Sequence, residues 1–104
     1  MSKEFRELTK VLTELFQDLS MPMGGEDIDE ESIFMEVPLH RITAKVDKGT
    51  YVVKAANGMV RLYSAEAVKK AFVTYFRKGE YALWAAFGNV PNPAFTANID
   101  YGWT

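Results

Sequence analysis

The chain has 104 residues, of which 48% are hydrophobic and 25% are charged, and it contains no cysteine. This composition excludes a disordered or collagen-like chain, and the missing cysteines exclude disulfide bonds, a thiolate nucleophile and a cysteine-bound metal. A chain of this length buries roughly 65% of the surface that its unfolded form exposes. We therefore expect one domain that comprises residues 1–104. The sequence starts without an apolar leader and has no run of about 18 apolar residues, so we expect a cytoplasmic protein with no membrane contact.

The net charge of −2 conceals a strong segregation of charge along the chain. Residues 21–38 contain six acidic residues and no basic one, whereas residues 39–79 contain nine basic and two acidic residues. Such a distribution indicates either neutralisation within the fold or a charged partner.

The first predicted element is an amphipathic helix over residues 3–19. Its apolar residues recur every three or four positions from Phe5 to Leu19, and Ser2 is a suitable N-cap. Pro22 and the glycines after it end the helix. Acidic residues occupy five of the six positions from 26 to 31, so we expect residues 20–32 to form an acidic loop.

Residues 33–63 predict a four-strand antiparallel meander, with strands over 33–37, 41–47, 50–56 and 59–63. For the second turn we choose Lys48-Gly49 as a two-residue loop. This loop places Val46 opposite Tyr51 and gathers the apolar residues on one face, which is what specifies register.

The last turn of the meander contains Asn57-Gly58, the strongest hairpin signal in the chain. A type I′ turn needs a positive φ at both central residues, which asparagine and glycine tolerate. This turn would place Lys54 directly opposite Arg61, an unfavourable pair of like charges unless an anion lies nearby.

The second face of the predicted sheet is therefore basic. Lysine and arginine neutralise phosphates while tyrosine stacks on bases. One alternative function predicted for this face is therefore the binding of nucleic acid or another polyanion. The acidic pI of about 5.4 and the missing RNA-recognition motif argue against it, and the acidic loop is an alternative cover for the same face. The candidate residues are Arg41, Lys45, Lys54, Arg61 and Tyr63.

A second helix is bounded by Ser64 as its N-cap and by Gly79 after its last turn. Residues 80–87 fit both a short helix and a buried strand, and their alanines together with Gly88 favour the helix. Residues 89–94 form a proline-containing linker, and strict alternation of apolar and polar residues predicts a strand over 95–104. The order α-ββββ-α-(α)-β is an α+β fold with helices on one face of the sheet.

Large aromatic rings are concentrated in the last third of the chain. Nine of the 14 lie in residues 72–104, and residues 81–104 contain one charged residue, Asp100. Aromatic enrichment with charge depletion is typical of interface cores, although a small domain also needs large rings to fill its interior. We expect part of this set to contact a protein partner or a second copy in a homodimer, with Trp84, Phe87, Phe95, Tyr101 and Trp103 as the candidates.

No catalytic, cofactor or metal motif stands out. His40 is the single histidine, and no nucleophile or orienting carboxylate can be assigned to it. The acidic run lacks the pattern of an EF-hand, and the glycines form neither a P-loop nor a dinucleotide-binding motif. We therefore expect no enzyme activity, no cofactor and no metal.

These observations predict a small non-catalytic binding or adaptor protein that acts through protein–protein contacts as a homodimer. Nucleic-acid binding through the basic face is the first alternative. A second alternative is a small-molecule pocket between the second helix and the sheet. The residues expected to line it are Tyr51, Phe72, Phe76 and Trp84.

Overall fold

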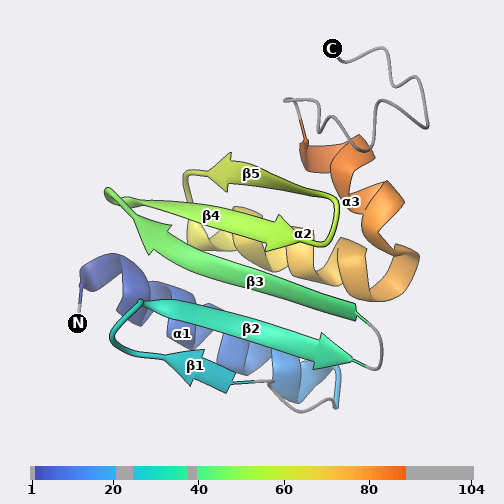
Figure 1. Cartoon of the computed structure of the whole chain (residues 1–104). Helices are drawn as coiled ribbons and strands as arrows, with labels where there is room; N and C mark the ends of the chain where they lie inside the picture. The colour runs from blue at the N-terminus through green and yellow to red at the C-terminus, as the bar shows by residue number, and fades with distance from the viewer. Residues whose placement is uncertain (1, 21–24, 38–39, 89–104) are drawn as a thin grey trace.

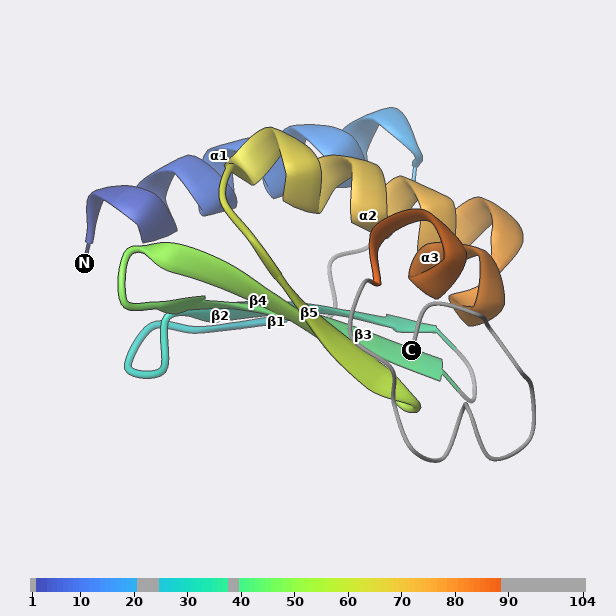
Figure 2. The ribbon, with the colours of Figure 1, turned by 90° about the horizontal axis from the view of Figure 1, so that it is seen from above.

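The structure, a computed structural model, describes residues 2–20, 25–37 and 40–88, without the side chains of residues 35–37, 40 and 41. In these ranges a five-stranded antiparallel sheet, with its strands in chain order, packs against helices (Figure 1). Figure 2 shows the helices together on one face of the sheet, which confirms the α+β class. The elements are α1 (Lys3–Asp18), β1 (Gly25–Asp27), β2 (Ser32–Val37), β3 (His40–Asp47), β4 (Thr50–Ala55), β5 (Gly58–Leu62), α2 (Ala65–Lys78) and α3 (Glu80–Phe87).

The strand that the sequence does not predict is β1, which lies inside the expected acidic loop 20–32. It pairs with β2, with Gly25 opposite Phe34 and Asp27 opposite Ser32. A Cβ atom at Gly25 would lie 2.7 Å from Cζ of Phe34, so the missing side chain lets the phenyl ring lie across the strand. β1 has three residues, two of which are Glu26 and Asp27, so it contains no alternation of apolar and polar residues. Hydrophobic periodicity therefore does not reveal this strand.

The predicted helices are confirmed, together with their N-caps. The hydroxyl of Ser2 accepts a hydrogen bond from the N–H of Phe5 at 3.1 Å, and the hydroxyl of Ser64 accepts one from the N–H of Ala67 at 3.1 Å. Residues 80–87 form a helix and not a strand. No helix within the described ranges is long and apolar enough to cross a membrane.

The β3–β4 hairpin has the predicted two-residue loop. Lys48 and Gly49 have φ values of 53° and 77°, as a type I′ turn requires, and Val46 lies opposite Tyr51. The register places Ala44 opposite Val53, and both side chains are buried beneath the helices.

The predicted type I′ turn at Asn57-Gly58 is wrong. Ala55 pairs with Gly58, and neither Asn57 nor Gly58 has a positive φ. The N–H of Asn57 donates instead to Oε2 of Glu80 in α3, at 2.5 Å, so a tertiary contact overrides the local turn preference.

The register of β4 and β5 is consequently shifted by two residues from the prediction. Lys54 lies opposite Met59, Arg61 lies opposite Val52, and the expected pair of like charges is absent between these strands. Because side chains alternate with a period of two, this shift leaves the same residues facing the helices.

The core lies between the sheet and the helices. A row of buried side chains crosses four strands at Ile33, Ala44, Val53 and Val60. The helices contribute larger groups, including Phe16 and Phe72, whose ring centroids are 6.2 Å apart. Burial of each large apolar side chain contributes about 1.5–3 kcal/mol. The buried helix residues are Phe5, Leu8, Leu12, Leu15, Phe16, Ala65, Val68, Ala71, Phe72, Tyr75, Leu83 and Trp84.

The predicted linker 89–94 and C-terminal strand 95–104 lie outside the described residues.

Candidate functional site

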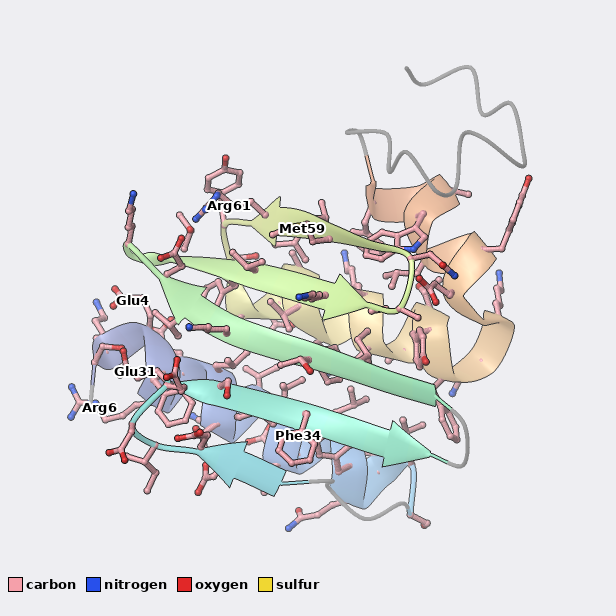
Figure 3. The ribbon with its side chains drawn as sticks, in the orientation of Figure 1. Glu4, Arg6, Glu31, Phe34, Met59 and Arg61 are labelled. Carbon is pink, nitrogen blue, oxygen red and sulfur yellow. The ribbon has the colours of Figure 1, made fainter. Side chains whose placement is uncertain are left out.

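The face of the sheet that points away from the helices is the candidate site, and we call it the outer face. Figure 3 views the sheet from this side. The strand register arranges its residues in two rows that run across all five strands. The first row contains Gly25, Phe34, Thr43, Lys54 and Met59, and the second contains Asp27, Ser32, Lys45, Val52 and Arg61.

Two of the predicted anion-binding residues are neutralised within the chain. Nζ of Lys45 lies 2.8 Å from Oε2 of Glu30, and Nη2 of Arg61 lies 2.9 Å from Oδ2 of Asp47. The guanidinium of Arg61 also donates to the hydroxyl of Thr50 and to the carbonyl oxygen of Asp47. Arg61 holds the pKa of Asp47 below its usual value, and Glu30 raises the pKa of Lys45.

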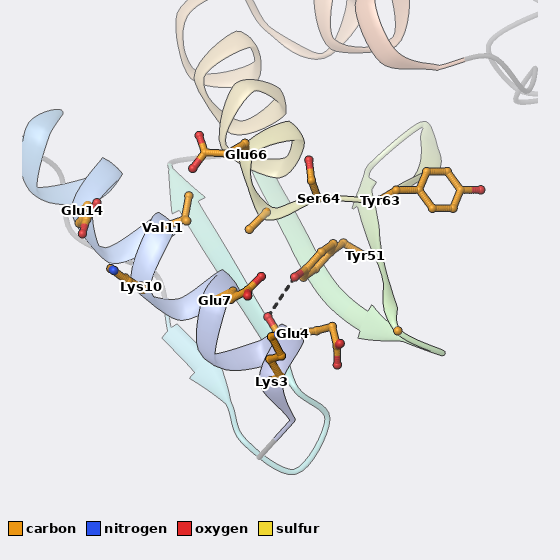
Figure 4. Close-up of a pocket in the computed structure, with 12 residues that line it drawn as sticks. Lys3, Glu4, Glu7, Lys10, Val11, Glu14, Tyr51, Tyr63, Ser64 and Glu66 are labelled. Carbon is orange, nitrogen blue, oxygen red and sulfur yellow. Dashed lines mark hydrogen bonds between the residues drawn. The ribbon is translucent and has the colours of Figure 1, made fainter.

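Lys54 differs from these two cations. Its side chain is exposed between Thr43 and Met59, and it forms no ion pair with any side chain that the structure describes. The backbone of Arg41 lies in β3 opposite Glu36, while the side chain of Arg41 is outside the described set. Tyr63 follows the end of β5, and its exposed ring is turned away from α1 (Figure 4).

Charge is unevenly distributed across the outer face. The exposed carboxylates of Glu26, Asp27, Asp29 and Glu30 lie on β1 and the turn after it, and we call these four residues the acidic edge. Lys54 and Arg61 lie on the opposite side of the sheet, on β4 and β5. No group of three or more potential metal ligands occurs among the described residues. The separation of the acidic edge from Lys54 and Arg61 gives the outer face an electrostatic polarity, which suits recognition of a charged surface.

Apolar side chains remain on the same face. Phe34 and Val52 are partly exposed, and Met59 retains 56% of its accessible surface. Sequence reasoning did not assign Phe34 to this face. The pairing of Phe34 with Thr43 would have revealed it, since residues opposite each other on adjacent strands point to the same side.

Trp84, a residue expected in the aromatic contact surface, is instead buried. Its side chain is 1% exposed, and its indole N–H donates to Oε2 of Glu80 at 2.9 Å, so Trp84 belongs to the core. Phe87 is partly buried and packs against that core. The other three candidates, Phe95, Tyr101 and Trp103, lie outside the described residues.

Within the described part of the chain, the four residues expected to line a small-molecule pocket lie in different surroundings. Phe72 and Trp84 are buried in the core, whereas the Phe76 side chain is 42% exposed on α2. Tyr51 instead lines a groove of about 610 Å³ between α1, the β3–β4 turn and the start of α2 (Figure 4).

This groove is mainly polar. The hydroxyl of Tyr51 donates to the carbonyl oxygen of Glu4 at 3.2 Å. Burial raises the pKa of Tyr51, and the nearby charges of Glu7 and Glu4 raise it further. Glutamate and lysine side chains form much of the remaining lining, which is unlike the apolar walls of a typical small-molecule site.

Comparisons of the chain with protein-family models, with curated proteins and with solved structures found no match. His40 begins β3, and its side chain is outside the described set.

Proposed function

We propose that the chain is a non-catalytic binding protein that acts through protein–protein contacts, and that one partner is a second copy of itself. The observation that carries this proposal is the outer face. The described helices cover only the opposite side of the sheet, while Phe34, Val52 and Met59 stay partly open to solvent. Antiparallel sheets commonly leave one face in water, but that face is usually polar. Apolar side chains on such a face favour a contact surface.

The charge distribution supports a symmetric arrangement. In a two-fold interface the same patch of each copy is used, so every contact occurs twice. Two outer faces packed in this way can set the acidic edge of one copy against Lys54 of the other. Met59 lies beside Lys54 in the same row and would lose its exposure in that contact. Complementary charge then fixes the orientation of the pair, and the apolar side chains provide the buried surface.

The test is sedimentation velocity of the full chain over about 1–100 µM, a range that resolves dissociation constants typical of modest homodimers. We expect a dimer. Lys54→Glu and Met59→Glu should each raise its dissociation constant by about tenfold or more, equivalent to about 1.4 kcal/mol. The matched controls are Lys70→Glu and Phe76→Glu, which change exposed residues of α2 on the other side of the molecule.

Two results would overturn the proposal. A wild-type chain that stays monomeric throughout this range rules out self-association. A dimer that is equally sensitive to the outer-face variants and to the α2 controls removes the outer face as its contact. Raising the salt concentration provides an independent check, because screening should weaken the contact between Lys54 and the acidic edge.

A further inference from the structure

Within the ranges that the structure describes, β5 forms an open edge of the sheet. Among the described residues β5 pairs with β4 alone, so it forms one edge while β1 forms the other. The β1 edge is protected because it is only three residues long and exposes Glu26 and Asp27. β5 is longer and contains no lysine or proline, and its charged residue Arg61 is drawn back over the sheet to Asp47. An edge of this kind can accept another strand.

The direction of the backbone groups shows which amides point to this edge. The residues that flank a two-residue hairpin loop exchange both of their backbone hydrogen bonds, and this pattern then alternates along the strand. Since Ala55 and Gly58 flank the loop, Val60 and Leu62 face β4 in the same way. Met59 and Arg61 therefore turn their N–H and C=O groups toward the open edge.

Helix α3 lies next to this edge and is itself incompletely covered. The bond between Glu80 and Asn57 fixes its first turn beside the β4–β5 loop, and Figure 1 shows α3 beyond β5. Glu80 is the only charged residue of α3, and Tyr81, Ala85 and Ala86 are exposed on it. A helix with apolar residues around its circumference is normally buried. Phe87, one turn after Trp84, is also only partly covered.

We propose that residues 95–104 of the same copy pair with β5 as a sixth strand, and that their apolar side packs beneath α3. The apolar side of this segment would continue the inner face of the sheet, and its polar side would continue the outer face. The apolar set is Phe95, Ala97, Ile99, Tyr101 and Trp103, and the alternating set is Thr96, Asn98, Asp100, Gly102 and Thr104.

The distance that the linker must span supports pairing within one copy. Residues 89–94 can extend over about 20 Å, and the five residues of β5 are about 17 Å long. Helix α3, which precedes the linker, lies on the side of the open edge (Figure 1). A short tether gives the segment a high effective concentration at its own β5, which favours it over the same segment of another copy. This pairing is independent of the contact proposed for the outer face.

Hydrogen exchange of the full chain, followed by NMR, tests the added strand. We expect slow exchange at the amides of Met59 and Arg61. In an antiparallel sixth strand Asn98 shares the outer face with Met59 and Arg61, so its N–H points to β5. Asn98→Pro removes this donor and should increase the exchange rate of these two amides by about a hundredfold. The control, Asn92→Pro, adds a proline to the linker and should leave both rates nearly unchanged. Protection of Ala44 and Val53 verifies that each variant remains folded.

A second pair of variants separates the two sides of the segment. Ile99→Asp places a charge on the apolar side and should accelerate exchange at Met59 and Arg61, whereas Asn98→Asp on the polar side should not. Exchange of these amides at the rate of an unstructured peptide in the wild-type chain would overturn the proposal. Protection that survives Asn98→Pro, or that disappears on dilution as a dimer dissociates, would also overturn it.

Discussion

The carboxylate of Glu80 accepts the backbone N–H of Asn57 at 2.5 Å, and this hydrogen bond ties the first turn of α3 to the loop between β4 and β5. The same oxygen accepts the indole N–H of Trp84 at 2.9 Å. One side chain therefore positions a hairpin loop and a buried ring together. Its removal should affect the sheet as well as the helix.

Glu80→Ala should lower the free energy of unfolding by about 1.5–3 kcal/mol, because hydrogen bonds to a charged acceptor contribute in this range. Urea denaturation followed by tryptophan fluorescence measures the effect. Glu66→Ala is the control, since Glu66 also lies in the first turn of a helix, and its carboxylate accepts no hydrogen bond from the described residues. Glu66→Ala should lower the free energy of unfolding by about 0.5 kcal/mol, because only the interaction of its carboxylate with the helix dipole is lost. Equal losses in the two variants would show that the contact with Asn57 contributes nothing.

The two hairpins show what the sequence can and cannot predict about turns. Apolar alternation identified the face of every strand in the β3–β5 region, and it also selected Lys48-Gly49 as a loop. Local preference alone favoured a turn at Asn57-Gly58, where the structure has none of the required positive φ values. The carboxylate that decides this turn comes from Glu80, 23 residues later in the chain. No local pattern encodes such a contact.

Gly49→Ala should destabilise the protein by about 1 kcal/mol. Its φ of 77° is unfavourable for a residue with a Cβ, while no atom beyond Gly49 and its two chain neighbours lies within 4 Å of the position that this Cβ would take. The cost is therefore one of backbone conformation and not of packing. Gly58→Ala is the matched control and should be neutral or stabilising, because Gly58 does not have a positive φ. Thermal unfolding of both variants makes the comparison. A larger loss of stability in Gly58→Ala than in Gly49→Ala would instead indicate a positive φ at Gly58, as the turn expected at Asn57-Gly58 requires.

The candidate site was only partly predictable, for a related reason. The positions of Lys45, Lys54 and Arg61 on one face follow from strand alternation, which is a local property. The expectation that the acidic loop covers this face agrees with the pairing of Glu30 with Lys45. The individual partner does not follow from a local pattern, because Glu30 lies 15 residues earlier in the chain. Burial of Trp84 depends in turn on where α3 packs, and composition alone does not distinguish a core ring from an interface ring.

Glu31 should make stability depend on pH. Its Oε2 accepts the backbone N–H of Ser2 at 2.7 Å, and this bond holds the pKa of Glu31 below its usual 4.5. A carboxyl whose pKa is lowered by folding stabilises the native state above its unfolded pKa, and this contribution is lost as the pH falls through the folded value. The melting temperature of Glu31→Gln should therefore lie below that of the wild type at pH 7, and the difference should shrink on acidification below about pH 4.5.

Glu26→Gln provides the control for this measurement, since no hydrogen bond or ion pair joins Glu26 to another described side chain. Its melting temperature should follow that of the wild type at every pH. A difference between Glu31→Gln and the wild type that stays constant from pH 7 to about pH 2 would contradict the assigned role of the bond to Ser2.

The paired cations of the outer face lead to a prediction about nucleic acid. Because Glu30 and Asp47 neutralise Lys45 and Arg61, we expect the wild-type chain to cause no mobility shift of single-stranded DNA at about 0.15 M salt. The double variant Glu30→Gln and Asp47→Asn frees both cations and should bind the same DNA at low salt. Log affinity should fall with log salt at a slope set by about two phosphate contacts. Replacement of Glu14 and Glu66 by glutamine changes the net charge equally on the other side of the molecule, and it should produce no binding. Strong binding by the wild type would instead make polyanion recognition the main activity of this face.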